Sequence, residues 1–351
     1  MEGIAPGETV AVVQRSAHPM GGRWQAPCPV LFLDQAMSGW PARLAHRGGR
    51  SWRDLRAGAV AGFLRRHGVR VVLGEYLDEF VEFVPLLDRM RLPYVAQGHG
   101  MDVSAALRDA GTAESYLAYR SARVVLTRCE PHRRRLIDLG LAAEQVCVNP
   151  GGVDLPPRVP ERGPAAARRL LAIGRMTPKK GPIYLLEAFR RAARLDPELT
   201  LDYIGAGDLL PAARQFVAAG DLQGRVRLHG AAADATKAAL LEACGVFVQH
   251  SLTDPETGDE EGLPAAIQEA MAHGMAVVST RHAGIPEAVI EAETGLLVDE
   301  GDVGAMAEAL VAVPAIAARL GAAGRRRAEA LYGWEQERSR LTGWLFDAVD
   351  A

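Results

Sequence analysis

Short apolar runs rich in Val, Ile and Leu alternate along the chain with longer segments whose apolar residues recur at helical spacing. This alternation is typical of βα units built around parallel sheets, and it occurs in both halves of the chain. We therefore predict helices in the intervals between strands. The predicted strands are 10–13, 30–33, 69–73, 94–97, 124–127 and 146–148 in the first half, and 170–173, 201–204, 226–228, 246–248, 276–279 and 296–298 in the second.

The segment 149–164 separates the two halves, because it is rich in Pro and Gly and lacks apolar periodicity. A length of 351 residues also suits two domains. We predict an α/β protein with two doubly wound, Rossmann-like domains, 1–155 and 156–333, facing a cleft lined by strand carboxyl ends. An amphipathic helix over 334–351 completes the chain, and periodicity does not decide whether it packs back on the first domain.

Composition and charge exclude several classes of protein. A net charge of −3 argues against a nucleic-acid surface, which relies on a cationic excess. No apolar run is long enough to span a bilayer and residues 1–13 do not resemble a secretory signal, so we expect a cytoplasmic protein. Cys28, Cys129, Cys147 and Cys244 form no CxxC pair, which argues against a disulfide scaffold or a zinc site.

The stretch 258–280 places two glutamates around the predicted start of a helix. Glu261 and Glu269 would lie roughly 12 Å apart along a regular helix, farther than the roughly 5–10 Å between glycosidase carboxylates. Gly262 and Leu263 occupy the predicted helix opening, where unpaired N–H groups and the helix dipole favour an anion. The spacing suits one long ligand, such as a nucleotide sugar, held at two places. Two solvated glutamates on an ordinary amphipathic helix are the alternative.

A basic loop follows the predicted strand 170–173. Arg175 offers a planar fork for phosphate oxygens and Lys180 a mobile point charge, which suits a diphosphate that gains negative charge as it leaves. The chain contains 37 arginines but only three lysines, Lys179, Lys180 and Lys237, and two of these lie in this loop. A solvated basic loop is the alternative.

Several motifs occur together in a fixed order between residues 170 and 300. They are GRMTPKKG, IGAGD, VRLHGA, EEGLPAAIQEAMAHGMAVVST, AGIPEAV and TGLLV. This set resembles the C-terminal domain of the family 4 retaining glycosyltransferases of GT-B fold. The long form TDPETGDEEGLP with STRHAGIPE is most similar to the colanic-acid-type branch, which acts in polysaccharide assembly. The resemblance implies a hexosyltransferase of class EC 2.4, with a nucleoside-diphosphate sugar as donor substrate and no other cofactor. No Asp-x-Asp sequence stands at a predicted strand end, so we also expect no metal ion.

The resemblance also implies roles for the charged residues. Arg175 and Lys180 match the arginine and lysine that hold the donor diphosphate in that family. Glu261 matches the glutamate that contacts the sugar hydroxyls, and Glu269 matches the glutamate that binds the ribose. We therefore expect Arg175, Lys180 and Glu261 in catalytic roles and Glu269 in donor binding.

Backbone positions follow by the same resemblance. Gly262 and Leu263 match the segment that approaches the phosphates. The predicted turn at 228–231, with Leu228 and Gly230, matches one beside the nucleobase. The N-terminal glycine-rich loop of the family is poorly matched, with Gly21-Gly22 as its only candidate.

The sequence QGHGMDVS at 97–104 resembles the His-Gly-x-Asp element of the family, whose histidine lies against the transferred sugar. His99 is therefore the candidate for positioning that sugar, and a structural histidine is the alternative. Asp102 either binds on the donor side or caps the following helix. His250 stands where the family commonly has Pro, and is either a satisfied loop histidine or a cleft group that alters donor choice.

The resulting hypothesis is a glycosyltransferase with a nucleotide sugar and an acceptor alcohol as partners, acting in polysaccharide, lipid-linked or small-molecule glycoside biosynthesis. A nucleotide-sugar epimerase of the same fold and a catalytically silent sugar-nucleotide binding module are the alternatives. Arginine clusters at 65–66, 133–135 and 325–327 allow at most peripheral contact with anionic lipid, and solvated faces are the alternative for them.

Overall fold

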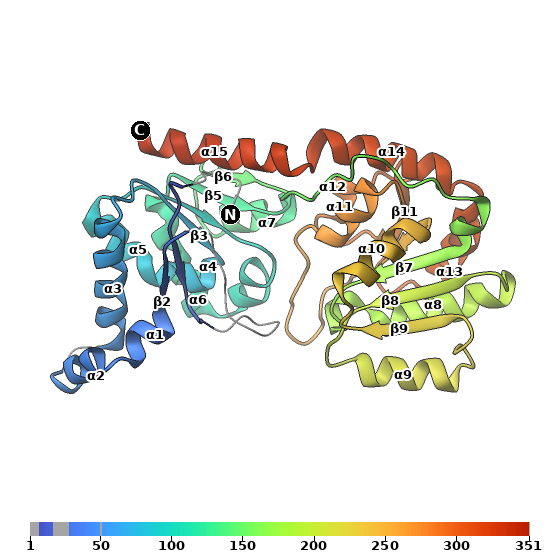
Figure 1. Ribbon diagram of the computed structural model, residues 1–351, viewed down its shortest axis with the longest axis horizontal. Helices are drawn as coiled ribbons and strands as arrows, with labels where there is room; N and C mark the ends of the chain where they lie inside the picture. The colour runs from blue at the N-terminus through green and yellow to red at the C-terminus, as the bar shows by residue number, and fades with distance from the viewer. Residues whose placement is uncertain (1–6, 17–27, 50, 351) are drawn as a thin grey trace. The chain divides into compact units, whose positions relative to one another are not determined.

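The computed structural model describes residues 7–16, 28–49 and 51–350 (Figure 1). The strands are β1 (Ala11–Val13), β2 (Val30–Phe32), β3 (Val72–Glu75), β4 (Tyr94–Gln97), β5 (Val124–Thr127), β6 (Val146–Val148), β7 (Arg169–Ile173), β8 (Thr200–Ile204), β9 (Val226–Gly230), β10 (Val246–Val248), β11 (Ala276–Thr280) and β12 (Gly295–Val298). The helices are α1 (Leu33–Ser38), α2 (Trp40–Arg47), α3 (Trp52–Arg66), α4 (Leu77–Phe80), α5 (Val84–Met90), α6 (Ala110–Ser115), α7 (Glu130–Asp138), α8 (Pro182–Leu195), α9 (Leu210–Ala219), α10 (Asp234–Ala243), α11 (Ala265–Ala272), α12 (Ile285–Ala288), α13 (Val303–Ala312), α14 (Ala317–Leu331) and α15 (Trp334–Asp350).

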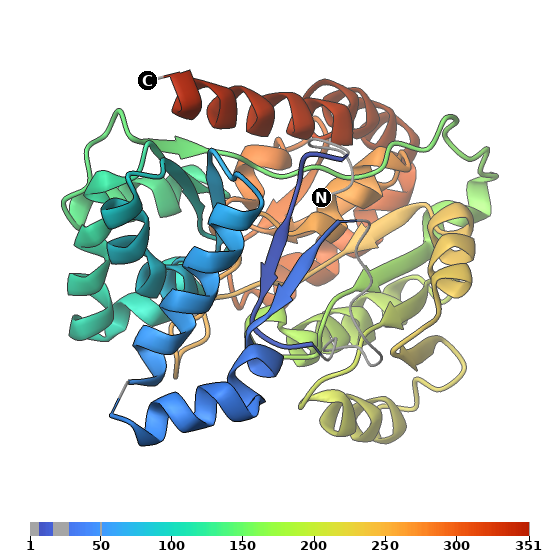
Figure 2. The ribbon, with the colours of Figure 1, turned by 60° about the vertical axis from the view of Figure 1, so that its left-hand side comes forward.

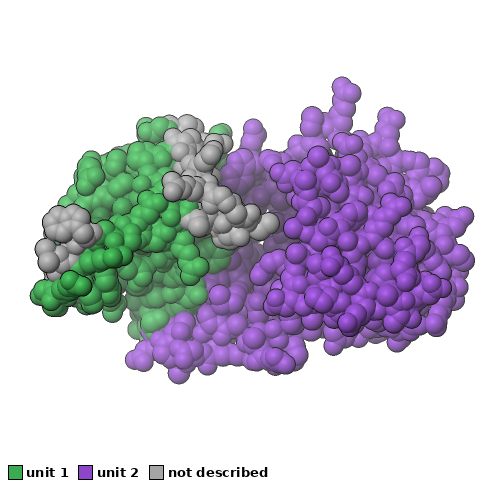
Figure 3. Space-filling view, turned by 60° about the horizontal axis from the view of Figure 1, so that its bottom comes forward, with its two compact units in different colours: residues 1–97, 115–125, 338–351 green, residues 98–114, 126–337 purple. Residues whose placement is uncertain are grey.

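The chain packs into two compact units, which Figure 3 colours separately. The first unit comprises Met1–Gln97, Ser115–Val125 and Arg338–Ala351, and the second comprises Gly98–Glu114 and Leu126–Glu337. These units group residues by packing alone. The predicted domain limits at residues 155 and 333 therefore stay predictions. So does the separation of the C-terminal helix, 334–351, from the two domains.

The largest sheet has six parallel strands in the order β12-β11-β10-β7-β8-β9. The chain starts at the centre with β7, runs outward through β8 and β9, and returns to pair β10 with β7. Leu170 lies opposite Val246 and Leu171 opposite Phe247 in this central pair. Such a reversal of strand order is a topological switch point, and ligands of open α/β sheets bind outside the carboxyl ends of the strands there.

Strand residues of this sheet alternate between two hydrophobic cores, as the two-residue period of a strand requires. Leu170 and Ala172 pack in one core with side chains from α8, α9 and α13, whereas Leu171 packs in the other with side chains from α10 and α11. Helices therefore cover both faces of the sheet (Figure 1). Because both faces are buried, the two central strands are continuous apolar runs over residues 170–173 and Val246–Val248.

The remaining strands form a four-stranded sheet, β3-β4-β5-β6, and a two-stranded parallel pair, β1-β2, which is seen in blue in Figure 2. The prediction of an α/β chain built on parallel sheets is confirmed. Strands β4, β5, β6 and β10 have the predicted limits. The prediction for β3 was placed too early, because pairing of Val72 with Tyr94 through Glu75 with Gln97 sets its limits, rather than the apolar run that begins at residue 69.

Within the described residues, no single helix combines the length and apolarity needed to cross a bilayer. The segments Val303–Ala315 and Ala317–Leu331 meet that test only as a pair, with a bend of 93° between them. Met306, Leu310 and Leu320 from this pair are buried in the core of the six-stranded sheet.

Gly321 lets α14 pack closely against the turn before β11. A Cβ atom built there would lie 2.1 Å from the carbonyl oxygen of Gly274, just before β11. We expect Gly321→Ala to force α14 away from the sheet and to lower the free energy of unfolding by about 1–3 kcal/mol, the usual cost of overpacking. Urea denaturation measures this change.

Gly343→Ala is the matched control, because Gly343 lies inside α15 with no atom within 4 Å of its Cβ position. Alanine there should stabilise the protein by about 0.5–1 kcal/mol, since it removes the cost of glycine inside a helix. Equal effects of the two substitutions would contradict the proposed close packing at Gly321.

Candidate functional site

Two loops meet at the switch point of the six-stranded sheet. The first follows β7 and contains the short 3-10 helix η6 (Pro178–Lys180); the second follows β10 and leads to α11. The backbone N–H of Leu252, in the second loop, donates a 3.0 Å hydrogen bond to the carbonyl oxygen of Lys179 in the first. Residues far apart in the sequence are thereby brought to the carboxyl ends of the two central strands.

Lysines from the first loop pair with carboxylates from the second. Lys180 Nζ lies 3.0 Å from Glu261 Oε2, and the side chains are only 12% and 11% exposed. Lys179 Nζ donates to Asp259 Oδ1 at 2.9 Å and to the carbonyl oxygen of Glu260 at 3.2 Å. Burial raises the pKa of Glu261, but Lys180 and Lys179 outweigh burial and hold the pKa below its usual value. Glu261 is therefore a buried carboxylate in its charged form.

Two groups of this cluster keep hydrogen-bonding capacity that the described part of the chain does not use. Glu261 Oε1 is buried without a hydrogen-bond partner there, and Lys179 Nζ lies 3.8 Å from it. Arg175 lies on the same loop with an exposed side chain that makes no ion pair or hydrogen bond to the described residues. An unused carboxylate oxygen accepts from a hydroxyl, and a free guanidinium forks onto phosphate oxygens.

The helix after Glu261 begins later than predicted. α11 starts at Ala265, with Pro264 as its N-cap, so Gly262 and Leu263 precede the helix instead of opening it. The cause is Pro264, because a residue before proline is driven out of the helical region. The helical spacing predicted between the two glutamates is therefore wrong, since only Glu269 lies on the helix.

The anion-binding capacity predicted for this segment is nevertheless present in its backbone. Neither the Gly262 nor the Leu263 N–H donates a hydrogen bond to any residue that the structure describes. Both groups lie just before the N-terminus of α11, which favours negative charge. Unlike helix-internal N–H groups, these two remain open to a ligand oxygen.

His99 lies directly after β4, and a buried aspartate fixes its backbone. Asp102 Oδ1 accepts from the N–H of His99 at 2.8 Å and from the N–H of Gly100 at 2.9 Å. Asp102 belongs to the 3-10 helix η2 (Met101–Val103) and reaches back to the residues before it. These contacts are those of a brace for His99 and not of a cap for a following helix.

Arg128 is a residue of this site that the sequence analysis missed. Its Nε and Nη2 lie 3.3 and 3.2 Å from His99 Nδ1, so Nδ1 accepts and His99 carries its proton on Nε2. A Cβ on Gly262 would lie 2.3 Å from the His99 carbonyl oxygen and 2.7 Å from Arg128 Cβ. The sequence contained one signal for Arg128, a charged residue immediately after the buried strand β5.

Glu269 projects from α11 and pairs with the third lysine. Lys237 Nζ, from α10, lies 2.6 Å from Glu269 Oε1, with side chains 35% and 23% exposed. All three lysines of the chain thus lie beside the two glutamates singled out from the sequence. The roles of Lys179 and Lys237 were missed, although their rarity among 37 arginines was the available signal.

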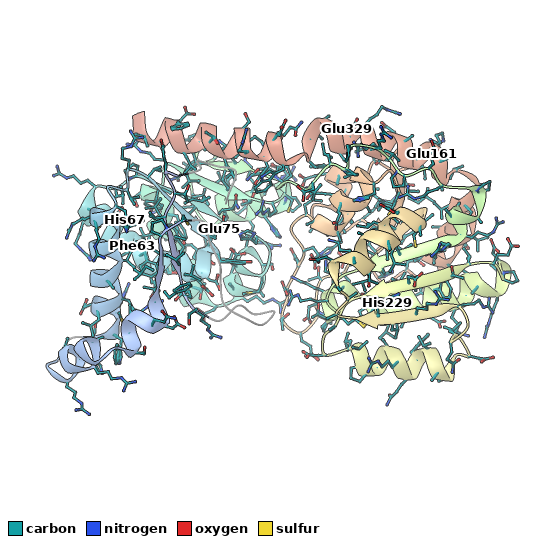
Figure 4. All side chains as sticks on the ribbon, in the orientation of Figure 1. Phe63, His67, Glu75, Glu161, His229 and Glu329 are labelled. Atoms are coloured by element: carbon teal, nitrogen blue, oxygen red, sulfur yellow. The ribbon has the colours of Figure 1, made fainter. Side chains whose placement is uncertain are left out.

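Leu228 and Gly230 lie on β9 itself, because the strand extends to Gly230 and the predicted turn begins only after it. The Gly230 carbonyl oxygen accepts from the N–H of Gly205 at 2.8 Å. His229 of the same strand, labelled in Figure 4, has Nε2 2.8 Å from Asp202 Oδ1. Strand β8 separates these residues from β7 and the lysine loop.

His250 lies in the loop after β10 and is fully buried. Its ring stacks on Tyr184 with centroids 5.4 Å apart, and its Nε2 accepts from the N–H of Gly301 at 3.0 Å. Burial lowers its pKa to about 4, so the ring is neutral at physiological pH. Its Nδ1 is buried without a hydrogen-bond partner among the described residues, so the ring is only partly satisfied and both readings of His250 stay predictions.

Several other predictions concern surface and metal chemistry. Among the arginine clusters, Arg133 pairs with Glu130 and Arg135 with Glu260, and Arg327 donates to the carbonyl oxygen of Glu287.

No group of three His, Cys, Asp or Glu side chains suited to a metal is found in the described ranges, and metal independence stays a prediction. Gly21-Gly22 lies outside the described residues.

Comparison with known proteins identifies the segment that builds this site. Residues 167–315 match the family model for glycosyl transferases group 1. This segment belongs to that family. It contains β7 to β12 and carries Arg175, Lys180, Glu261 and Glu269.

Relatives of the group 1 segment bear out the resemblance to the colanic-acid-type branch. WcaL of Escherichia coli K12, whose name assigns it to colanic acid biosynthesis, is 33% identical over 218 residues, covering 61% of this chain and 53% of WcaL. The amylovoran biosynthesis glycosyltransferase AmsK of Erwinia amylovora is 34% identical over 186 residues, covering 51% of this chain and 44% of AmsK. The chain spans about half the length of the curated relatives it matches.

Solved structures show the fold of the whole chain. HepE from Anabaena, in complex with UDP and glucose, matches with a TM-score of 0.73 at 18% identity, covering 96% of this chain and 99% of HepE. Sucrose-phosphate synthase from Thermosynechococcus elongatus matches with a TM-score of 0.72 at 21% identity, covering 97% of this chain and 88% of that one. These likenesses confirm the prediction of a GT-B α/β fold with parallel sheets.

The Lys180 to Glu261 pair predicts a loss of stability that depends on pH. Lys180→Met leaves a buried carboxylate with only Lys179 nearby, and we expect a loss of about 3 kcal/mol at pH 7, typical of a broken buried pair. The folded pKa of Glu261 is lowered, so the pair contributes fully above the unfolded pKa of about 4.3 and its contribution fades as pH falls through the folded value. Urea denaturation at pH 7 and pH 4 measures the difference.

Lys237→Met is the control, because its pair with Glu269 is about one third exposed on the lysine side. Such a pair contributes less than about 1 kcal/mol. Equal losses in the two variants at pH 7, or a loss in Lys180→Met that grows as the pH is lowered, would contradict this account of the buried pair.

Proposed function

We propose that this protein is a retaining glycosyltransferase that moves a hexose-type sugar from a nucleoside diphosphate to an acceptor hydroxyl. The observation that carries the proposal is the convergence of Lys180, the buried carboxylate of Glu261 and the two unbonded N–H groups of Gly262 and Leu263. The cation and the N–H donors suit the oxygens of a diphosphate, and the carboxylate suits the hydroxyls of a sugar ring. Their place at a topological switch point is where such a ligand binds.

The diphosphate departs with increased negative charge when the bond between the anomeric carbon and its oxygen breaks. Lys180 and the Gly262 and Leu263 N–H groups stabilise that charge from positions held before the reaction begins, and the exposed Arg175 adds its guanidinium when the diphosphate binds. The acceptor oxygen bonds to the anomeric carbon on the face that the phosphate leaves, and its proton passes to a phosphate oxygen. Configuration is retained in this way without a protein nucleophile.

The two sugar rings of the donor engage the two glutamates. Glu261 accepts from hydroxyls of the transferred sugar through its unused Oε1. His99 donates from Nε2 to the same sugar, because Arg128 occupies its Nδ1. Glu269 accepts from the ribose hydroxyls, while its Oε1 stays with Lys237. Leu228 and Gly230 remain candidates for contact with the base.

Names of the relatives support the acceptor class. WcaL and AmsK are named for colanic acid and amylovoran biosynthesis, and a 31% identical relative from Corynebacterium glutamicum is named a GDP-mannose-dependent monoacylated alpha-(1-6)-phosphatidylinositol monomannoside mannosyltransferase. A growing polysaccharide or a glycolipid is therefore the proposed acceptor, with at most peripheral membrane contact.

The proposed cytoplasmic location rests on the four scattered thiols, which suit a reducing compartment.

The donor base is decided by a thermal-shift screen with UDP-, GDP-, ADP- and dTDP-sugars. A ligand that binds only the folded protein raises its melting temperature by mass action, so the true donor is the one with the largest shift. Incubation of that donor without acceptor then tests the chemistry, because an epimerase would convert it to an isomer. Binding without transfer across an acceptor panel would instead indicate a silent binding module.

Substitutions in the donor site test the assigned roles. We expect Lys180→Ala and Glu269→Ala each to cost at least ~1–3 kcal/mol of transition-state stabilisation, about 5- to 150-fold in kcat/KM, because each removes a hydrogen bond to a charged group. Donor turnover is measured at a temperature where circular dichroism shows both variants folded.

Arg191→Ala is the surface control, since Arg191 lies on α8 with a half-exposed side chain paired only to Glu187 among the described residues. Its turnover should equal that of the wild type. Wild-type rates in Lys180→Ala or Glu269→Ala would remove the corresponding assignment.

A further inference from the structure

A buried histidine outside the roles assigned above holds the main chain of Glu261. His282 follows β11, is 1% exposed, and its Nε2 accepts a 3.0 Å hydrogen bond from the Glu261 N–H. Two residues further on, the N–H of Gly284 donates to the carbonyl oxygen of Gly262 at 3.0 Å. The segment after β11 thus fixes both sides of the peptide between Glu261 and Gly262.

A carboxylate sets the proton position of this histidine. Glu300, after β12, lies with Oε1 2.6 Å from His282 Nδ1. A carboxylate accepts, so Nδ1 carries the proton and leaves Nε2 free to accept from Glu261. The opposite tautomer would set an Nε2 proton against the Glu261 N–H. Glu300 therefore selects the one neutral form of His282 that holds Glu261 in place.

The same carboxylate also holds the loop that leads to Glu261. Glu300 Oε2 accepts from the N–H of Thr253 at 2.8 Å. Glu300 thereby fixes the loop after β10 at two points. It bonds directly to Thr253 near the start of the loop, and it acts on Glu261 through His282. Loss of the Glu300 bond to Thr253 or to His282 would move the Glu261 carboxylate relative to Lys180, which comes from the separate loop after β7.

We infer that His282, oriented by Glu300, is a positioning residue that sets Glu261 and thereby governs affinity for the sugar part of the donor. The inference rests on the proposed function, in which Glu261 contacts the transferred sugar. His282 touches neither nucleotide nor sugar in this scheme, and it acts through the backbone of Glu261. A relay of this kind alters binding of the nucleotide sugar more than binding of the nucleoside diphosphate, because only the sugar contacts the Glu261 carboxylate while Arg175 also holds the diphosphate.

Two amide substitutions separate the two hydrogen bonds of the histidine. In His282→Asn the side-chain amide stands near the former Nδ1, so it still donates to Glu300 and no longer reaches the Glu261 N–H. In His282→Gln the amide oxygen reaches the former Nε2 position and still accepts from Glu261. Both variants carry a side-chain amide and differ only in its reach, so each serves as the control for the other.

Glu300→Gln disturbs the relay without touching the histidine. Both His282 Nδ1 and the Thr253 N–H donate to Glu300, and an amide offers only one acceptor oxygen. Either Thr253 loses its acceptor, or His282 changes tautomer and turns a proton toward Glu261. We expect this variant to weaken nucleotide-sugar binding in the same selective manner as His282→Asn.

Calorimetric titration with UDP and UDP-glucose, and with GDP and GDP-mannose, provides the test. For the pair that the wild type binds, we expect His282→Asn to weaken binding of the nucleotide sugar about tenfold and of the nucleoside diphosphate by less than about twofold. His282→Gln should stay within about threefold of the wild type for both ligands. Wild-type melting profiles confirm that each variant is folded.

The outcomes separate this inference from the proposed function. Wild-type binding with equal losses for nucleotide and nucleotide sugar in His282→Asn would make His282 a merely structural residue and overturn the inference alone. Identical behaviour of His282→Asn and His282→Gln would do the same. Failure of the wild type to bind these four probes or any ADP- or dTDP-sugar would remove both the inference and the proposed function.

Discussion

The buried carboxylate of Glu261 is the constraint on which the rest of the site depends. An ionised group with so little exposure requires partners, because an unpaired buried charge is strongly unfavourable. Lys180 and Lys179 supply the countercharges and His282 accepts from its backbone N–H. Three loops from different strands of one sheet must therefore meet before this residue can be buried.

The order of strands makes this meeting possible. β7 and β10 are neighbours although about seventy residues separate them along the chain, and their carboxyl ends deliver the lysine loop and the glutamate loop to one place. Side chains of the strands alternate between two cores on opposite faces, so the sheet is held rigidly from both sides. Rigid strands place the charged loops more accurately than the loops alone would.

All three lysines of this chain pair with Glu261 or Glu269. Elsewhere arginine serves, as in the bonds of Arg327 and Arg135 to carbonyl oxygens and in the contact of Arg128 with His99. A lysine ammonium is a compact charge on a flexible stem, whereas a guanidinium is a fixed fork.

Local pattern in the sequence determined the strands, the parallel α/β class and the candidates Arg175, Lys180, Glu261 and Glu269, because apolar periodicity and loop chemistry are properties of neighbouring residues. The start of α11 was predicted too early. Pro264 keeps the residue before it out of the helical region, so the helix begins only at Ala265. Only the tertiary structure joined Arg128 to His99 and Glu300 through His282 to Glu261. These partners come from separate strands, and strand order, which sets such pairings, is not encoded in any local pattern.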